Sequence, residues 1–301
     1  MDELELPFQA PFDWPRMLRF FRGRASAGVE VVEGDSYLRT IEWQGDGGLL
    51  RVRLDPQHNC LIARIDGPAS RHLGALQPKL STLFDLHTDL HQVHAALGQD
   101  PWLKRLLAQA PGLRIPGAWS AFELVVRTIV GQQVSVKAAT TITGRLVQRA
   151  GRPLEVPGHP AVAWQFPTPS ALAAANLDLI GMPGKRVAAL QGFAHAVAEG
   201  RLAIDACSDP GDLAQLRKAL LDMPGIGPWT VEYTAMRAWR DTDAWPASDL
   251  VLMQAIAREH PLALKLPQQA IHSAAWRPWR AYAAMHVWNE LADQAGVQRG
   301  G

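Results

Sequence analysis

The sequence predicts an α+β protein, with a small antiparallel sheet in its N-terminal domain and an all-helical remainder made of two subdomains. Three observations predict this fold. Runs that alternate polar and apolar residues, bounded by Gly and Asp turns, occur only in the first part of the chain. Beyond residue 89, apolar residues recur at helical spacing between Gly and Pro turns. At 301 residues, the chain can form two or three domains that each bury a core.

The N-terminal domain is expected over residues 1–89. Asp13, followed by Trp14-Pro15, starts a short helix there, because a side-chain cap before an early proline favours helix initiation. Gly45-Asp46-Gly47-Gly48 is interpreted as a turn between strands. A helix near 70–83 closes the domain. The four alternating runs that predict its strands are 29–32, 37–43, 49–54 and 60–65.

The helical remainder divides at Pro and Gly clusters. Residues 90–117 form a connector and a helix that packs with the C-terminal subdomain, 118–234 form one helical subdomain, and 235–301 form the other. Ser120 and Glu123 have the spacing of a capping box, in which each side chain accepts a hydrogen bond from the other residue's amide. The helix that follows breaks at 131–133 and resumes to about residue 150. Further helices are expected at 248–259 and 281–295.

Charge and cysteine content exclude several classes of protein. Residues 1–89 carry 10 Lys and Arg against 13 Asp and Glu, whereas residues 90–301 carry 20 against 16. A surface for nucleic acid is therefore expected on the C-terminal two-thirds of the chain. Cys60 and Cys207 alone provide no disulfide framework and no four-cysteine cluster. The acidic start and the lack of a long apolar run predict a cytoplasmic protein without a membrane anchor.

One stretch carries the strongest functional signal. Pro224-Gly225-Ile226-Gly227 predicts a hairpin in which positive φ lets the backbone approach a ligand closely. The next helix would direct its free amides and the positive end of its dipole at a phosphate. Such contacts need few charged side chains, which suits a nearly neutral chain. The alternative is an ordinary helix cap and turn.

Aromatic and acidic residues follow this hairpin. Trp229 and Tyr233 are four residues apart, so they share one helical face and can wall a slot for a flat base. The alternative is that these rings belong to a core stripe with Met236 and Trp239. Asp249 stands where the next helix should begin, where the helix dipole and free amides favour a charged carboxylate. It could be a catalytic carboxylate or simply a helix cap.

Taken in order, six stretches give the chain a specific resemblance that extends over nearly its whole length. The chain resembles the 3-methyladenine DNA glycosylase II (AlkA) family of the helix-hairpin-helix–Gly/Pro–Asp superfamily. The resemblance implies that the helical remainder is a two-subdomain all-helical helix-hairpin-helix glycosylase core. The stretches are PFDWPRMLRFFRGRA at 11–25, LFDLHTD at 83–89, FELVVRTIVGQQVS at 122–135, PGIGPWTVEYTAMRAW at 224–239, SDLVLMQ at 248–254 and WRPWRAYAAMHVW at 276–288.

The resemblance implies a role for individual residues. Asp249 would be catalytic, and Gln133 would fill the gap that a flipped nucleotide leaves in the duplex. The backbone carbonyls of Leu221, Met223 and Ile226 would hold a Na⁺ or K⁺ ion at the hairpin, and no other cofactor is required. The implied base pocket comprises Phe20, Trp229, Tyr233, Leu250 and Trp288. The implied DNA contacts, besides Gln133, are Pro224, Gly225, Ile226, Gly227 and Thr230.

Two positions depart from the best-known family form, which has leucine at the position of Gln133 and tyrosine at that of Leu250. Superfamily members that also cut the strand carry a lysine two residues beyond the second hairpin glycine, where it forms a Schiff base with the sugar. Here that residue is Trp229. The resemblance therefore implies a monofunctional glycosylase.

The expected partner is double-stranded DNA that contains alkylated bases, bound by a monomer with no obligate protein partner. Two alternatives are a superfamily glycosylase for another lesion, such as oxidised guanine, and a DNA-binding module that has lost its chemistry. A separate alternative concerns His87, His91 and His94. Their helical spacing could place three imidazoles on one face as metal ligands, although a solvated face is the commoner outcome.

Overall fold

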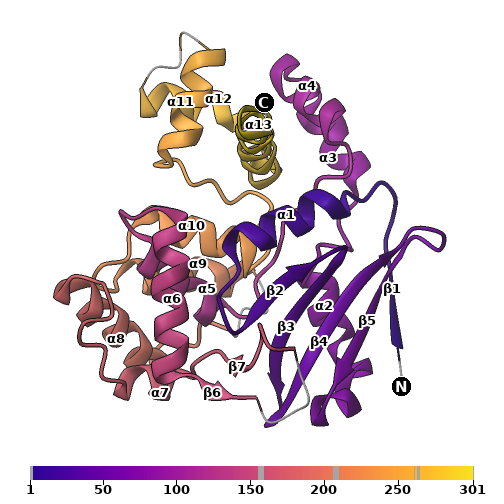
Figure 1. Cartoon of the computed structure of the whole chain (residues 1–301). Helices are drawn as coiled ribbons and strands as arrows, with labels where there is room; N and C mark the ends of the chain where they lie inside the picture. The colour runs from indigo at the N-terminus through magenta and orange to yellow at the C-terminus, as the bar shows by residue number, and fades with distance from the viewer. Residues whose placement is uncertain (1–2, 155–158, 206–209, 261, 263–264, 301) are drawn as a thin grey trace.

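A computed structural model describes residues 3–154, 159–205, 210–260, 262 and 265–300 of the chain. It confirms the α+β fold class: a five-stranded antiparallel sheet precedes a helical core (Figure 1). None of the helices in these ranges is long and apolar enough to cross a membrane. Cys60 is buried in the sheet, whereas Cys207 lies outside the described residues.

The sheet has the strand order β1-β5-β4-β3-β2. The four predicted strands are confirmed, and a fifth, β1, was missed because its five residues are held by pairing with β5, far along the chain. The predicted turn was wrong in position, because Asp46, Gly47 and Gly48 belong to β4. The turn residues are Gln44 and Gly45, whose φ angles of 51° and 86° suit a tight hairpin. The strands are β1 (Glu3–Pro7), β2 (Glu30–Glu33), β3 (Ser36–Trp43), β4 (Asp46–Asp55) and β5 (Cys60–Asp66).

Helices complete the N-terminal domain. Helix α1 (Trp14–Arg24) starts as predicted, with Asp13 accepting a hydrogen bond from the Arg16 amide. The predicted helix at 70–83 is only partly correct: two 3₁₀ segments come first, and α2 (Gln77–Leu83) is the α-helical part. Pro78 explains this start, since a proline is tolerated in the first turn of an α-helix but not in its interior.

The remainder is helical except for two short strands, β6 (Arg152–Pro153) and β7 (Trp164–Gln165). These strands correct the all-helical prediction. The Trp164 amide donates a hydrogen bond to the Gly28 carbonyl, and the Trp164 carbonyl accepts one from the Thr40 hydroxyl. Both partners belong to the N-terminal domain, and sequence periodicity does not reveal such a tertiary contact. The helices are α3 (Leu90–Leu97), α4 (Pro101–Gln109), α5 (Ala121–Gly131), α6 (Val136–Ala150), α7 (Pro169–Ala174), α8 (Gly184–Ala198), α9 (Pro210–Leu221), α10 (Pro228–Arg237), α11 (Leu250–Glu259), α12 (Leu266–Ala274) and α13 (Arg280–Gly300).

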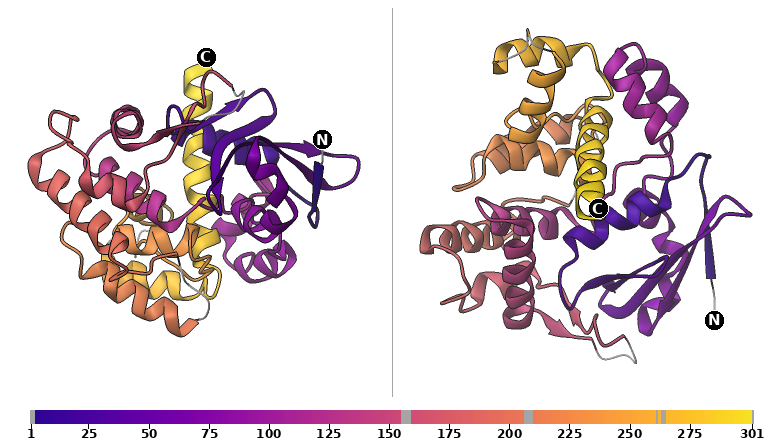
Figure 2. Two further views of the ribbon diagram at one scale, coloured as in Figure 1. Left: turned by 90° about the horizontal axis from the view of Figure 1, so that it is seen from below. Right: turned by 45° about the horizontal axis from the view of Figure 1, so that its top comes forward.

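The helices bury two main cores. One core combines α5, α6 and α8 with the start of α10, and the other combines α3, α4, α11 and α13 with the end of α10. Helix α10 therefore connects the two. Figure 2 shows α13 running beside α1, where Arg16 and Arg19 pair with Asp293. This contact brings the C-terminal helix against the N-terminal domain.

A buried ion cluster also joins the N-terminal domain to α5. Arg39 pairs with Glu123 at 2.8 Å, and Arg127 pairs with Glu30 at 2.7 Å and Glu123 at 3.1 Å. The Tyr37 hydroxyl donates to Glu30 at 2.6 Å. We call these five residues the ion cluster. Burial and the Glu30 charge raise the pKa of Tyr37 well above its ordinary value.

Because of the ion cluster, only one half of the predicted capping box forms. Ser120 Oγ accepts from the Glu123 amide at 3.0 Å, as expected. The reciprocal half was wrong, because the Glu123 carboxylate bonds Arg39 and Arg127. Hydrogen bonds between charged partners are about twice as strong as neutral ones, so the guanidinium groups draw this carboxylate away from the helix start.

Candidate active site

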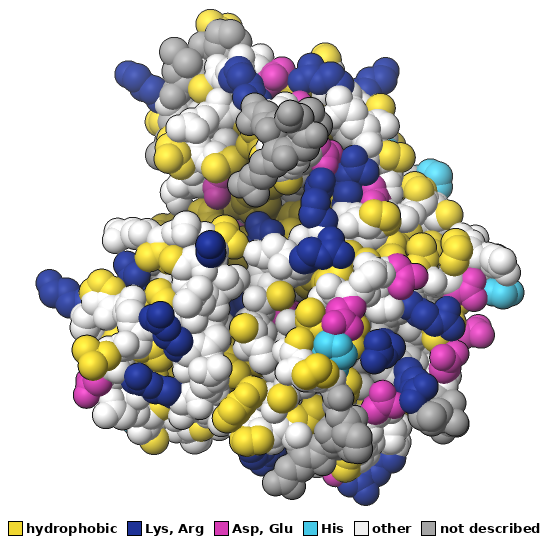
Figure 3. Space-filling view, viewed as in Figure 1, with side chains coloured by type: hydrophobic (Ala, Val, Ile, Leu, Met, Phe, Trp, Pro, Cys, Tyr) yellow, Lys and Arg dark blue, Asp and Glu magenta, His cyan; other side chains and the backbone are white. Residues whose placement is uncertain are grey.

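A cavity of about 560 Å³ opens between the two helical cores. Its walls come from the end of α1, from α5, the following loop and α6 on one side, and from α10, the start of α11 and α13 on the other. Figure 3 shows the surface hollowed between the part formed by α11 and α12 and the part formed by α6 and α10. The cavity therefore lies where the two subdomains meet.

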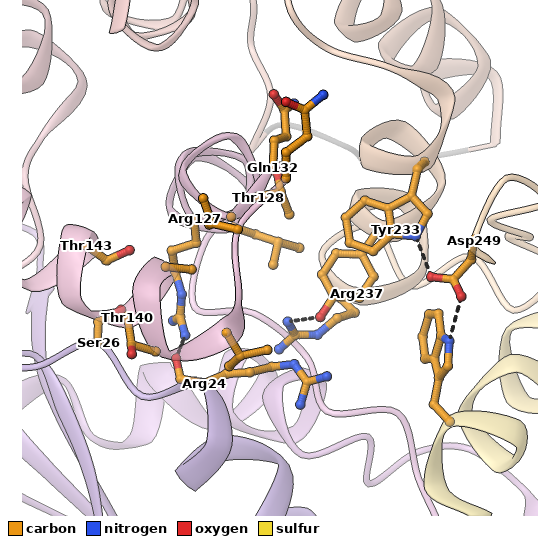
Figure 4. Close-up of a pocket in the computed structure, with 18 of the residues that line it drawn as sticks. Arg24, Ser26, Arg127, Thr128, Gln132, Thr140, Thr143, Tyr233, Arg237 and Asp249 are labelled. Carbon is orange, nitrogen blue, oxygen red and sulfur yellow. Dashed lines mark hydrogen bonds between the residues drawn. The ribbon is translucent and has the colours of Figure 1, made fainter. Parts of the chain in front are cut away.

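Asp249 lies in the wall of this cavity and has two roles at once. Its Oδ1 caps α11 by accepting from the Leu252 amide at 2.9 Å, and it also accepts from Trp288 Nε1 at 3.3 Å. Its Oδ2 accepts from Trp229 Nε1 at 2.8 Å (Figure 4). The capping interpretation and the functional one are therefore compatible, since three N–H donors orient the carboxylate and stabilise its negative charge.

Three aromatic rings stand beside this carboxylate. Trp229 and Tyr233 are stacked, with ring centroids 4.7 Å apart and planes 15° apart. Trp288 meets Tyr233 edge-on at 6.1 Å. The core alternative holds for Met236 and Trp239, which pack in the hydrophobic cores. Trp229 and Tyr233 line the cavity instead. The stripe of aromatic residues and Met236 is therefore partly core and partly cavity wall.

Phe20 does not line the cavity. The guanidinium groups of Arg24 and Arg237 lie over its ring, 3.9 Å and 4.7 Å from the centroid. The sequence-based prediction missed these groups, and Arg127, as cavity residues. Arg237 had a readable signal, because it is four residues beyond Tyr233 and so shares its helical face. The side chain of Arg24 reaches the cavity only through the tertiary fold.

Arg237 also shapes the electrostatics of the cavity. It donates to the Tyr233 hydroxyl at 2.9 Å and to the carbonyls of Pro116 and Gly117. Burial acts to raise the pKa of Tyr233, but the charges of Arg237 and Arg24 outweigh it and lower that pKa below its ordinary value. Burial, together with Arg24 and Arg127, lowers the pKa of Arg237. The cavity thus combines aromatic walls with positive charge.

The structure does not place Leu250 in the cavity, which corrects that assignment. Leu250 is 63% exposed, whereas its neighbour Val251 lines the wall. Successive residues of an α-helix are rotated by about 100° about its axis, so the Leu250 side chain can lie in solvent while that of Val251 lines the wall. The prediction was based on the correspondence of Leu250 to a pocket residue of the family, and it did not take this rotation into account.

Gln133 lies at the rim of the cavity, in the loop between α5 and α6. Its φ angle is 57°, an uncommon conformation for a residue other than glycine, and its side chain is exposed. The preceding Gln132 was missed by sequence reasoning. Its side chain donates to the Gly225 carbonyl at 2.9 Å, which ties the loop that carries Gln133 to the hairpin.

The hairpin connects α9 to α10. Gly225 has the expected positive φ of 81°, and a Cβ there would lie 2.7 Å from the Cβ of Ala189. Gly227 differs, since its φ is −103° and a Cβ there would meet nothing within 4 Å. Thr230 is 3% exposed, so its side chain is not available to DNA. Only its amide, in the first turn of α10, can face a ligand.

The metal alternative for His87, His91 and His94 was wrong. Within the described residues, these three do not bring their ligand atoms together. Asp89, near them in sequence, caps α3 by accepting from the His91 amide at 2.9 Å. His87 precedes α3, which carries His91 and His94, so the three histidines do not share one helical face.

Two known families of protein domains match this chain. Residues 126–281 match the HhH-GPD superfamily of base excision DNA repair proteins, and residues 3–120 match the AlkA N-terminal domain. The fold and site thus define a base excision DNA repair protein of the helix-hairpin-helix type. DNA-3-methyladenine glycosylase 2 of Escherichia coli (strain K12) is 36% identical over 286 residues, which cover 94% of this chain and 95% of the relative. The chain belongs to the AlkA family.

Other relatives limit what similarity alone can say about the lesion. The probable bifunctional transcriptional activator/DNA repair enzyme AlkA of Mycobacterium tuberculosis (strain CDC 1551 / Oshkosh) is 37% identical over 96% of this chain. The chain spans only 57% of that relative's length. A 3-methyladenine DNA glycosylase from Archaeoglobus fulgidus shares the fold, with 19% identity, a TM-score of 0.79 and coverage of 95% and 97% of the two chains. A Clostridium acetobutylicum 8-oxoguanine glycosylase/lyase shares it at a TM-score of 0.64, with 15% identity and coverage of 88% and 99%. Fold alone therefore does not define the lesion.

Proposed function

We propose that this protein is a monofunctional DNA N-glycosylase that excises alkylated bases, such as 3-methyladenine and 7-methylguanine, and leaves an abasic site. The observation that carries the proposal is the Asp249 carboxylate, held by the indole N–H groups of Trp229 and Trp288 in a cavity with aromatic walls. We place this activity in the cytoplasm, on a monomer bound to double-stranded DNA.

The charges on the alkylated base and on the sugar determine the proposed mechanism. An alkylated purine is cationic and is already a good leaving group, so it needs no proton from the enzyme. The sugar becomes positively charged as the glycosidic bond breaks, and Asp249 stabilises that charge. The carboxylate also orients the water whose oxygen bonds to the sugar carbon and takes the proton that this water loses, while the departing base takes the electrons of the broken bond. No step needs a covalent link to the protein, and Trp229 occupies the position of the lysine that forms such a link in strand-cutting relatives.

Selection of the lesion does not depend on ring contacts alone. A cationic base gains about 0.5 to 2 kcal/mol from each good contact with an aromatic face, and Trp229 and Tyr233 offer such faces. Arg24 and Arg237 oppose this gain, because both carry positive charge near the same cavity. The weak glycosidic bond of the lesion and its easier extrusion from the duplex then contribute most of the selectivity.

The remaining contacts belong to DNA. The hairpin and the first turn of α10 would bind phosphate through amides, and Gln133 would fill the gap left by the flipped nucleotide. The carbonyls of Leu221, Met223 and Ile226 would hold a Na⁺ or K⁺ ion. The turn suits such an ion in one respect: positive φ at Gly225 bends the chain, and Met223 O, which accepts from Ile226 N at 3.2 Å, has a second lone pair.

Base release from methylated duplex DNA tests the proposal directly. We expect free 3-methyladenine in the medium and strands that remain intact until alkali cleaves them at the abasic sites. Chromatography of the released bases and denaturing gels run with and without alkali measure the two results. Release of oxidised guanine alone would support another lesion, nicking without alkali would contradict the monofunctional mechanism, and DNA binding without any release would favour a non-catalytic module.

The two hairpin glycines should respond differently to substitution. Gly227→Ala is expected to leave the melting temperature unchanged, because its φ is negative and a Cβ has open space. DNA should bind about tenfold more weakly, ~1.4 kcal/mol, because the methyl group occupies the space where the phosphate backbone approaches. Fluorescence anisotropy with a duplex and thermal unfolding measure both quantities.

Gly74→Ala is the matched control, since Gly74 also has open space around a Cβ but lies in the N-terminal domain. Gly225→Ala should lower both the melting temperature and the affinity, because of its positive φ and the contact with Ala189. Unchanged DNA affinity in Gly227→Ala would show that the hairpin does not bind the backbone at this residue.

A further inference from the structure

Three possible metal-ligand atoms come together at a point outside the cavity. Asp100 directly precedes α4, His260 follows the last residue of α11, and His272 lies in the last turn of α12. Each residue offers one ligand atom, and these atoms all lie within 4.8 Å of one another. Since the first two are 160 positions apart in the sequence, only the folded chain brings them together. We call these three residues the His-Asp triad.

The carboxylate of the triad is already oriented by its neighbours. Asp100 Oδ1 accepts from the amides of Trp102 at 2.9 Å and Leu103 at 3.3 Å. Its Oδ2 accepts from Trp276 Nε1 at 2.9 Å and lies 3.5 Å from His272 Nε2. Two ligands of a tetrahedral zinc ion, with bonds of about 2.1 Å, lie about 3.4 Å apart. The spacing of these two atoms therefore fits a shared metal ion.

The imidazole nitrogens give the second, independent observation. His260 Nε2 is buried and has no hydrogen-bond partner among the described residues, and the buried His272 Nε2 has only its 3.5 Å contact with Asp100 Oδ2. Buried polar atoms in folded proteins nearly always have a partner, so two poorly satisfied nitrogens at one point need an explanation. The two rings are also close, with centroids 3.8 Å apart and planes 44° apart. Two neighbouring lone pairs beside a carboxylate form a donor set for a cation.

The surroundings of the triad favour a cation. His260 caps the C-terminus of α11, where the helix dipole is negative and favours a cation. The hydrogen bond from Trp276 to Asp100 is the kind of outer contact that orients a metal ligand.

We propose that Asp100, His260 and His272 bind one divalent transition-metal ion of the zinc class and leave a fourth position open to water. Two imidazole nitrogens and one carboxylate oxygen suit zinc and its neighbours, whereas magnesium prefers oxygen ligands alone. The ion joins α4, α11 and α12. Helix α11 begins directly after Asp249, about 15 Å from the ion along the helix axis, so the ion braces that helix and takes no part in the reaction. This site does not depend on the proposed glycosylase function.

Metal titration of the full chain without a polyhistidine tag tests the site. Protein stripped with EDTA is titrated with zinc chloride against a chromophoric chelator, and its melting temperature is measured with and without zinc. We expect one zinc ion per chain and a rise in melting temperature of about 4 °C at a zinc concentration 100-fold above Kd. Magnesium chloride should produce neither effect. Cobalt(II) in place of zinc should give the intense visible absorption of a four-coordinate ion.

Matched variants separate this site from surface binding. His260→Phe and His272→Phe keep an aromatic ring next to Trp102 and Trp276, and each should bind zinc at least tenfold more weakly and lose the rise in melting temperature. His91→Phe makes the same change at an exposed histidine and should behave as the wild type. Equal zinc affinity in His272→Phe and wild type, or no 1:1 binding by the wild type, would overturn the proposal.

A milder variant covers the case in which a phenylalanine prevents folding. Asp100→Asn keeps one oxygen, which can still cap α4, but it replaces the Oδ2 atom near His272 by an amide NH₂ group and removes the negative charge on the ligand. It should fold, as judged by circular dichroism, and bind zinc at least tenfold more weakly. If a folded Asp100→Asn protein binds zinc as the wild type does, the carboxylate is not a ligand and the assigned site is wrong.

Discussion

Asp249→Asn is expected to lower the rate of base release by about a thousandfold, the loss that follows when a group that stabilises transition-state charge is removed. Asparagine has nearly the same shape but no negative charge to offset the positive charge on the sugar. Single-turnover release of 3-methyladenine from methylated duplex DNA measures the effect. The affinity for undamaged duplex should remain within about twofold, because the hairpin that would bind phosphate is unchanged.

The folded state should tolerate this substitution. Asn and Asp are about equally good N-caps, so the hydrogen bond from the Leu252 amide to residue 249 can persist. Asp89→Asn is the matched control, since Asp89 caps α3 in the same way at a distance from the cavity. Its rate of release should equal that of the wild type. Undiminished release by Asp249→Asn would exclude Asp249 as the catalytic carboxylate.

Arg39→Met is expected to destabilise the protein by about 3 to 5 kcal/mol, the cost of removing one partner of a buried ion pair. Arg39 is 2% exposed, lies on β3 and pairs with Glu123 of α5. Without it, Glu123 keeps only its contact with Arg127, which Glu30 shares. Two buried carboxylates would then compete for one guanidinium group. Urea unfolding, with the midpoint and slope compared between variants, measures the loss.

Arg53→Met is the matched control for this change. Arg53 lies on β4, next to β3, and pairs with Glu3 at 3.7 Å, with about half of each side chain exposed. Exposed pairs of this kind contribute about 0 to 1 kcal/mol, so its unfolding midpoint should stay close to that of the wild type. A similar, small loss in Arg39→Met would mean that the ion cluster is not what joins the sheet domain to the helical core.

Much of the fold follows from local sequence. Period-two runs predicted four of the five strands, and caps such as Asp13 and Ser120 predicted the starts of α1 and α5. The misses have a common cause. Strand β1 is short and depends on its pairing with β5, and the true turn at Gln44-Gly45 depends on the register between β3 and β4. Both are decided by long-range pairing, which local periodicity does not encode.

Some features of the site also follow from local sequence, whereas others depend on the tertiary structure. The sequence alone determined the hairpin, the helix cap at Asp249 and the shared face of Trp229 and Tyr233, because each depends on residues within one or two turns. Only the tertiary structure decided that Trp288 donates to Asp249 from 39 residues away, and that Arg24 enters the cavity.

The same limit applies to Leu250 and to the His-Asp triad. Correspondence with a relative placed Leu250 in a pocket, but the rotation of one helical residue exposes its side chain. Spacing along one helix suggested a metal site at histidines that do not meet, whereas the triad joins residues from three helix ends. Local hydrogen bonding and periodicity act between sequence neighbours; burial, charge pairing and ligand geometry act between residues that only packing brings together.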